Sequence, residues 1–204
     1  MNRIDKIFYI NLEDRKDRNI EVINELNKNF KFENAERFNA IKHDRGALGC
    51  LFSHLELLRQ MEINGWNTMM IIEDDVELLT TRESVDTLID SFLDNNQLDI
   101  LCFGNNCQTF TNINEHFNRC FDTQTTSCYV IKRHMISPIL KLFIPSTEDM
   151  IHSNLEAVID CNKIIDVEWK KIQPTYQFVM PLTRQVKQRY SYSDIEKRIV
   201  DYYV

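Results

Sequence analysis

The sequence predicts an α/β fold whose mainly parallel sheet is covered by helices on both faces. Short apolar runs, typical of buried strands, alternate with amphipathic helical patterns along most of the chain. The 204 residues, of which 43% are hydrophobic, suffice for a sizeable core. Neither an internal repeat nor a linker rich in Pro, Gly or Ser interrupts the alternation. We therefore expect one domain that covers residues 1–204.

The individual elements follow from the spacing of apolar residues. Expected strands are the apolar runs at residues 7–10, 38–41, 69–72, 100–103 and 128–131. Expected helices include one with Ile20, Ile23 and Leu26 on its buried face, and others at residues 48–58, 80–93 and 135–143. Two capping boxes, Thr80 with Glu83 and Ser193 with Glu196, predict helix starts. Residues 105–121 are polar and without a period, which predicts a long loop.

Charge and composition exclude several classes of protein. The net charge of −7 leaves no obvious basic face for nucleic-acid phosphates, so we expect no nucleic-acid partner. No stretch approaches the roughly 18 apolar residues of a transmembrane helix, and residues 1–12 lack a signal-peptide pattern. We therefore expect a cytoplasmic protein. The cysteines form no CxxC pair and lie in apolar contexts, which favours reduced core thiols over disulfides or structural zinc.

Three adjacent carboxylates, Glu73, Asp74 and Asp75, directly follow the apolar run at residues 69–72. Ligands of open α/β sheets bind at the carboxyl ends of strands, where a divalent cation would turn carboxylate repulsion into coordination. If the chain stays extended, Glu73 and Asp75 share a face. The alternative is that these are solvated loop acids. The triplet alone does not choose among nucleotidyl transfer, phosphohydrolysis and sugar transfer.

Three segments in this order resemble glycosyltransferase family 25. They are residues 8–18 (FYINLEDRKDR), 46–54 (GALGCLFSH) and 71–76 (IIEDDV). Weaker likenesses at residues 38–40, 125–131, 173–177 and 193–195 extend the resemblance over nearly the whole chain. The family includes bacterial lipooligosaccharide β-galactosyltransferases and procollagen galactosyltransferases.

The resemblance implies a GT-A-like fold and a metal-dependent transfer that inverts the anomeric carbon. Its donor would be a UDP-sugar, with galactose as the first candidate sugar and glucose as the second. The cofactor would be Mn²⁺ or Mg²⁺. The acceptor would be a glycan, or a hydroxylated protein or lipid-linked molecule.

The resemblance also implies roles for individual residues. Asp149 is the candidate catalytic base, with Glu148 as the alternative. The candidate metal ligands are Asp75, Glu73 and His152. The candidate donor-binding residues are Asn11, Arg15, Arg18, Ala40, Ser53, His54, Glu73 and Asp74. Arg15 and Arg18 would pair with phosphate oxygens or with the acidic triplet; the alternative is a solvated helix start.

Two other functions remain open at this stage. One is a metal-dependent phosphohydrolase or nucleotidyltransferase built on the same acidic strand end. The other is a non-catalytic domain that binds nucleotide sugars or glycans.

Overall fold

The computed structural model describes residues 3–30, 34–144, 163–189, 192–193 and 198–199. The strands are β1 (Lys6–Asn11), β2 (Glu36–Asn39), β3 (Thr68–Glu73), β4 (Val76–Leu78), β5 (Ile100–Cys102), β6 (Phe110–Asn112), β7 (Phe117–Cys120), β8 (Cys128–Lys132), β9 (Phe178–Pro181), β10 (Val186–Gln188), β11 (Tyr192–Ser193) and β12 (Arg198–Ile199). The α-helices are α1 (Lys16–Glu25), α2 (Gly46–Asn64), α3 (Arg82–Asp94), α4 (Ile136–Leu140) and α7 (Ile165–Glu168). Three further helical segments are the π-helix η1 (Leu26–Phe30) and the 3-10 helices η2 (Arg133–Met135) and η3 (Trp169–Ile172).

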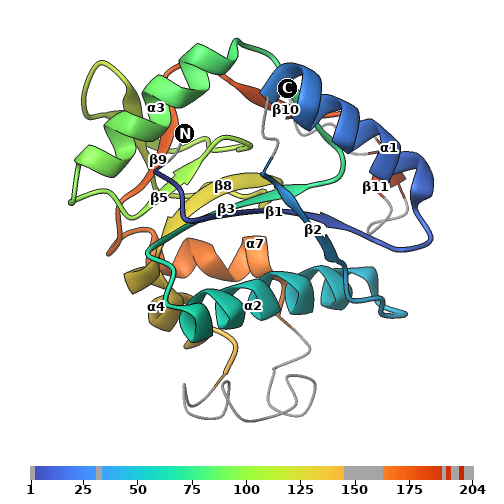
Figure 1. The fold of residues 1–204 in the computed structure, drawn as a ribbon. Coiled ribbons are helices and arrows are strands. Elements are labelled where there is room, and N and C mark those ends of the chain that lie inside the picture. Colours follow the sequence, from blue (N-terminus) through green and yellow to red (C-terminus); the bar gives the residue numbers. More distant parts are fainter. Residues whose placement is uncertain (1–2, 31–33, 145–162, 190–191, 194–197, 200–204) are drawn as a thin grey trace.

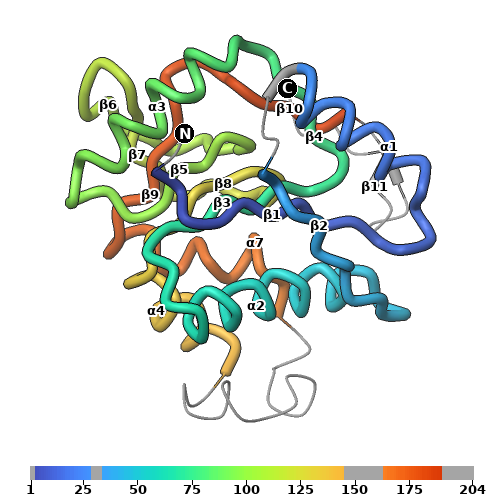
Figure 2. Tube along the Cα trace, in the orientation of Figure 1, coloured from blue at the N-terminus to red at the C-terminus, as the bar shows by residue number. Residues whose placement is uncertain are grey.

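A mixed sheet with the strand order β2-β1-β3-β8-β5-β9-β7-β6 forms the centre of the described fold (Figure 1). Strands β2, β1, β3, β5, β9 and β6 run in one direction, and β8 and β7 run in the other. Figure 2 shows β2 near one end of this sheet and the β6–β7 hairpin at the other. The predicted mainly parallel sheet is therefore confirmed, with antiparallel β8 between β3 and β5.

Helices cover both faces of the sheet, as Figure 1 shows. Alternate residues of β3 enter two separate cores, since Met69 and Ile71 pack with α2, α4 and α7, whereas Met70 and Ile72 pack with α1 and α3. Burial on both faces explains why the strand is an unbroken apolar run. No helix in the described part of the chain is long and apolar enough to cross a membrane.

The polar stretch at residues 105–121 was expected to be a loop, and this prediction is wrong in part. Within it, β6 and β7 pair in an antiparallel hairpin, with Phe110 opposite Cys120. The Asp122 carboxylate accepts hydrogen bonds from the backbone N–H groups of Gln108 and Thr109 and closes the base of the hairpin. The residues of β6 are exposed, so this segment contains no apolar run from which a strand could be predicted.

Two predictions about helix starts are wrong. Thr81, not Thr80, caps α3, and its hydroxyl accepts a hydrogen bond from the backbone N–H of Ser84. Ser193 does not begin a helix, because it lies in β11 and pairs with Arg198 of β12.

The predicted buried face of the first helix needs a correction as well. Ile20 is 62% exposed, while Val22 and Leu26 are buried. The α-helix ends at Glu25 and continues as the π-helix η1. Val22 and Leu26 are four residues apart and share the buried face, whereas Ile20 lies on the exposed side of the helix.

Candidate donor site

A pocket of about 570 Å³ lies where β1 and β3 end and α2 begins. Its walls come from residues 10–18, 40–54 and 73–74. All the residues predicted to bind the donor line it: Asn11, Arg15, Arg18, Ala40, Ser53, His54, Glu73 and Asp74. Their role in nucleotide binding stays a prediction. Their convergence follows from the parallel pairing of β1 with β3, in which Ile10 lies opposite Glu73.

The three carboxylates of the acidic triplet turn toward different neighbours. Strand β3 ends at Glu73, and the chain turns through Asp74 and Asp75 before β4 begins. The strand alternation expected to put Glu73 and Asp75 on one face therefore does not apply beyond Glu73.

Glu73 faces helix α2 and the turn before β8. Its Oε1 lies 3.3 Å from His54 Nε2 and accepts a hydrogen bond of 2.9 Å from the Thr126 hydroxyl. Burial acts to raise the pKa of Glu73, but the bonds from His54 and Thr126 outweigh it, and the pKa is lowered. Glu73 is therefore ionised at neutral pH.

Asp74 faces the exit of β1. It accepts a hydrogen bond of 2.7 Å from Asn11 Nδ2, and Arg18 Nη1 lies 3.3 Å from its Oδ1. Burial and the charge of Glu73 raise the pKa of Asp74, although Asn11 and Arg18 favour its carboxylate form. Arg18 was predicted to pair with phosphate oxygens or with the acidic triplet, and in the structure it contacts the triplet through Asp74.

Asp75 has a buried oxygen, Oδ1, that has no hydrogen-bond partner among the described residues. Its Oδ2 lies 3.3 Å from Gln188 Nε2 of β10, which pairs with β4. Burial, followed by the charges of Glu73 and Asp74, raises the pKa of Asp75 to about 7. An unsatisfied buried carboxylate beside two others has the chemistry of a ligand for a hard divalent cation.

Arg15 is directed toward a neighbour on its own helix rather than toward the acidic triplet. Its Nη2 lies 2.8 Å from Asp17 Oδ2. The hydrogen bond from Arg15 lowers the pKa of Asp17 to about 2. Both side chains are partly or largely exposed, so the pair contributes little to stability.

The beginning of α2 is tied to the segment that follows β2. The Ser53 hydroxyl donates to the Gly49 carbonyl and accepts from the Ile41 N–H. One residue further, the fully buried His54 stacks on Tyr129, whose hydroxyl lies 3.0 Å from His54 Nδ1. The side chains of Ser53 and His54 are therefore held in fixed positions at the pocket wall.

The sequence model of glycosyltransferase family 25, described as an LPS biosynthesis protein, matches residues 44–154, more than half of the chain. The chain belongs to glycosyltransferase family 25. No curated protein sequence matches it.

Solved structures show that this family 25 glycosyltransferase has a GT-A-like fold. One similar structure is a glycosyltransferase involved in glycosylation of the major capsid of PBCV-1, with 9% identity, coverage of 86% of this chain and 80% of that one, and a TM-score of 0.50. Another is a mannose-1-phosphate geranyltransferase from Thermus thermophilus, with 8% identity, coverage of 87% and 59%, and a TM-score of 0.50. A weaker likeness, which does not contribute to the fold assignment, is to GalNAc-T7 with UDP, GalNAc and Mn²⁺, with 10% identity, coverage of 91% and 38%, and a TM-score of 0.48. At these identities the likeness concerns the fold alone.

The candidate base of this glycosyltransferase, Asp149 with Glu148 as its alternative, and the candidate metal ligand His152 lie outside the described residues. Their roles stay predictions.

Several residues of the site were not predicted from the sequence. Cys50 was expected to be a core thiol, but it is half-buried and lines the pocket; burial, then the charge of Glu73, raises its pKa well above the usual value. Thr126 and Tyr129 contact Glu73 and His54 from the β8 side. Asp166 of α7 is a further acid whose pKa is raised by burial and by Glu73. The helical spacing of Cys50 and His54 was the one available signal; the other contacts join distant parts of the chain.

We expect Gly49→Ala to destabilise this family 25 protein by about 1–3 kcal/mol, the usual effect of overpacking. A Cβ at Gly49 would lie 2.5 Å from the Ile41 carbonyl oxygen, a backbone atom that cannot rotate away. Urea unfolding measures the difference. Gly104→Ala is the matched control, because its Cβ meets the Ser127 hydroxyl, a side chain that can rotate. Equal loss of stability in the two variants would contradict this explanation.

Proposed function

We propose that this glycosyltransferase moves a hexose from a UDP-sugar to an acceptor hydroxyl, with metal assistance and inversion of the anomeric carbon. Galactose is the first candidate sugar and glucose the second. The proposed acceptor is a glycan or a hydroxylated protein or lipid-linked molecule. Family membership supports the reaction class, and the pocket at the ends of β1 and β3 supplies space for a nucleotide sugar.

The single observation that carries the metal dependence is the unsatisfied Oδ1 of Asp75 beside Glu73 and Asp74. Hard oxygen ligands of this kind suit Mn²⁺ or Mg²⁺. Asp75 and Glu73 would hold the ion, with His152 as a further candidate ligand. The bound ion would stabilise the negative charge of the leaving diphosphate.

Other residues of the pocket would bind and orient the donor. Arg18 carries a guanidinium at the pocket wall, next to Asp74, and is a donor for phosphate oxygens together with Arg15. Asn11 and Ala40 are the candidates for the uracil. The backbone N–H of Ala40 bonds to the Asn11 carbonyl, which keeps the two residues adjacent. Ser53 and His54 complete the donor side from α2.

The acceptor hydroxyl must lose a proton as it attacks the anomeric carbon opposite the nucleotide. A positioned carboxylate performs this step in an inverting displacement. We assign this role to Asp149, with Glu148 as its alternative. Glu73 is committed to His54 and Thr126 on the donor side, and therefore does not serve as this base.

A panel of nucleotides tests the donor assignment. We expect UDP to raise the melting temperature more with Mn²⁺ than without it, and more than GDP or ADP does, because a ligand that binds only the folded state stabilises it. Incubation with UDP-galactose, Mn²⁺ and an acceptor glycan should then release UDP together with a glycosylated product.

Each failure has a distinct meaning. Equal stabilisation by the three nucleotides, or indifference to Mn²⁺, contradicts the donor assignment. Binding of UDP-sugars without turnover would identify a binding domain, and release of inorganic phosphate would identify a phosphohydrolase.

A further inference from the structure

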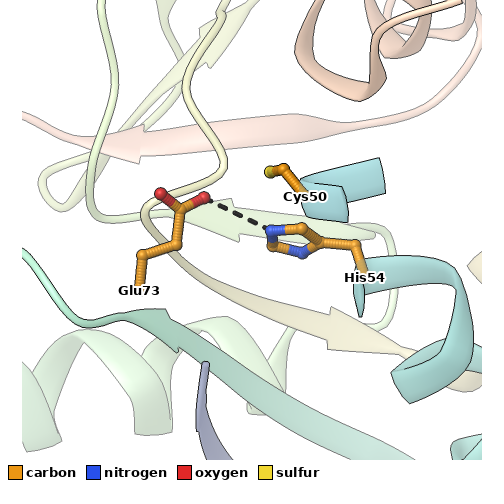
Figure 3. A group of neighbouring side chains, drawn as sticks. All are labelled: Cys50, His54 and Glu73. Atoms are coloured by element: carbon orange, nitrogen blue, oxygen red, sulfur yellow. Dashed lines mark hydrogen bonds and ion pairs between the residues drawn. The ribbon is translucent and has the colours of Figure 1, made fainter. Parts of the chain in front are cut away.

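A second group of metal-ligating side chains lies at the wall of the same pocket. Cys50 and His54 are four residues apart and therefore share one face of α2, and Glu73 approaches them from the end of β3. Figure 3 shows the three side chains directed toward one another. The Cys50 thiol, a ring nitrogen of His54 and a Glu73 carboxylate oxygen all lie within 4.8 Å of one another.

The orientation of His54 is the one expected of a metal-binding histidine. Its imidazole is fully buried, and Nδ1 lies 3.0 Å from the Tyr129 hydroxyl. Histidines that bind metals are commonly held in this way through the nitrogen that does not face the ion. The other nitrogen, Nε2, lies 3.3 Å from Glu73 Oε1. A carboxylate only accepts hydrogen bonds, so a proton or a cation must lie between these two atoms.

We infer that Cys50, His54 and Glu73 form a binding site for a thiophilic divalent cation such as Zn²⁺. Sulfur, nitrogen and carboxylate oxygen are the three ligand types that Zn²⁺ accepts, and three protein ligands leave a fourth position for water or a ligand in the pocket. Zn–S and Zn–N bonds of about 2.3 and 2.1 Å place tetrahedral ligand atoms roughly 3.5 Å apart. The observed grouping needs only small side-chain adjustments to reach that spacing. Upon binding, the Cys50 thiol proton passes to solvent, and the proton on His54 Nε2 is exchanged for one on Nδ1, which then donates to the Tyr129 hydroxyl.

This site differs in chemistry from the proposed Mn²⁺ site. Asp75 offers hard oxygen and no sulfur, whereas Cys50 and His54 are softer ligands that favour Zn²⁺ over Mn²⁺ or Mg²⁺. Glu73 belongs to both proposals, so Zn²⁺ at Cys50 and His54 would compete for it. The inference goes beyond the proposed function, because Zn²⁺ binding requires neither a nucleotide nor an acceptor.

Cobalt provides a direct test. Full-length protein freed of metal with a chelator is titrated with Co²⁺, whose absorption spectrum shows a charge-transfer band when a thiolate is a ligand. We expect the band to appear in the wild-type protein and to disappear when Zn²⁺ is added. In Cys50→Ser the band should be absent, and Zn²⁺ affinity should fall by about tenfold or more, at least the loss seen when a supporting partner is removed.

Matched variants separate this site from other thiols and from the proposed function. Cys107→Ser removes a half-buried thiol that contacts Asp122, and it should keep the band. Asp75→Asn should also keep it, even if sugar transfer is lost. A wild-type protein without the band, or Cys50→Ser with the wild-type band and affinity, would overturn the inference.

A second measurement needs no variant. Zn²⁺ should slow the alkylation of Cys50 by iodoacetamide, as mapped by mass spectrometry, and should leave the rate at Cys107 unchanged. Equal rates at Cys50 with and without Zn²⁺ would overturn the inference even if Cys50→Ser failed to fold.

Discussion

Asp75→Asn is expected to lose glycosyl transfer by about 100-fold or more, because a catalytic metal ion supplies several kcal/mol of charge stabilisation. The substitution keeps the size of the side chain and an oxygen that can still accept from Gln188. It removes the negative charge that would hold the ion. Initial rates of UDP release with acceptor present, measured over a range of Mn²⁺ concentrations, give the loss directly.

The same variant should be more stable than the wild-type protein at high pH when chelator removes all divalent cations. The pKa of Asp75 is raised from 3.8 to about 7 by burial and by Glu73 and Asp74, against the opposing charge of Arg18. Below pH 4 the carboxyl is protonated in both the folded and unfolded states. Between pH 4 and pH 7 the unfolded state releases the proton first, so the contribution of Asp75 to the free energy of unfolding falls by about 1.4 kcal/mol for each pH unit.

Asparagine does not titrate, and Asp75→Asn therefore avoids this loss. Urea unfolding measures the free energy of unfolding of both proteins at pH 4 and pH 8. The difference between them should be smaller at pH 4, and at pH 8 the variant should be the more stable of the two. Asp90→Asn, on the exposed side of α3, is the control and should change neither activity nor the pH dependence. Wild-type turnover in Asp75→Asn would disprove the metal role, and a variant less stable than wild type at pH 8 would disprove the electrostatic argument.

Asp149→Asn is expected to lower the turnover rate by about 100-fold to 10,000-fold, the usual contribution of a positioned general base. Asparagine keeps the shape and the hydrogen bonding of the side chain and removes its basicity. The affinity for the UDP-sugar should change little, because the lost group acts mainly in the transition state. Turnover measured at saturating donor, combined with donor binding measured by calorimetry, separates the two effects.

Two other acids serve as comparisons. If Glu148→Gln is inactive and Asp149→Asn is active, the base is the neighbouring residue. Asp166 of α7 lies close enough to Glu73 for its pKa to be raised by it, and loss of turnover in Asp166→Asn alone would move the base to this helix. Normal turnover in Asp149→Asn contradicts the assignment in either case.

The sequence predicted strands β1, β2, β3, β5 and β8 of the central sheet, but it did not predict β6, β7 or β9. The clearest of the predicted strands is β3, because burial on both faces requires apolar residues throughout. Met69 to Ile72 are fully buried and form one apolar run. The sequence does not indicate the direction of β8, because Cys128 to Ile131 would be equally apolar in a parallel or an antiparallel strand. Strand β6 was not predicted because its residues are exposed and form no apolar run.

The site was predictable as a set of residues but not as a set of contacts. Parallel strands end at the same edge of the sheet, so residues after β1 and β3 had to meet. The turn at Asp74 and Asp75 is a local departure from strand geometry that alternation does not foresee. The contact between Asp75 and Gln188 joins residues 113 positions apart, and no local pattern encodes it.

The place of β8 between β3 and β5 has a consequence for the nascent chain. When the ribosome has made β1, β2 and β3, these strands can already pair, but the β3 edge that faces β8 in the finished sheet still lacks a partner. Its backbone stays open, flanked by the apolar side chains of Met69 to Ile72, until Cys128–Lys132 have been made. Open apolar edges of this kind recruit other chains. A fragment that stops after α3 is therefore expected to aggregate, and synthesis must pass Lys132 before the strand at the centre of the molecule is protected.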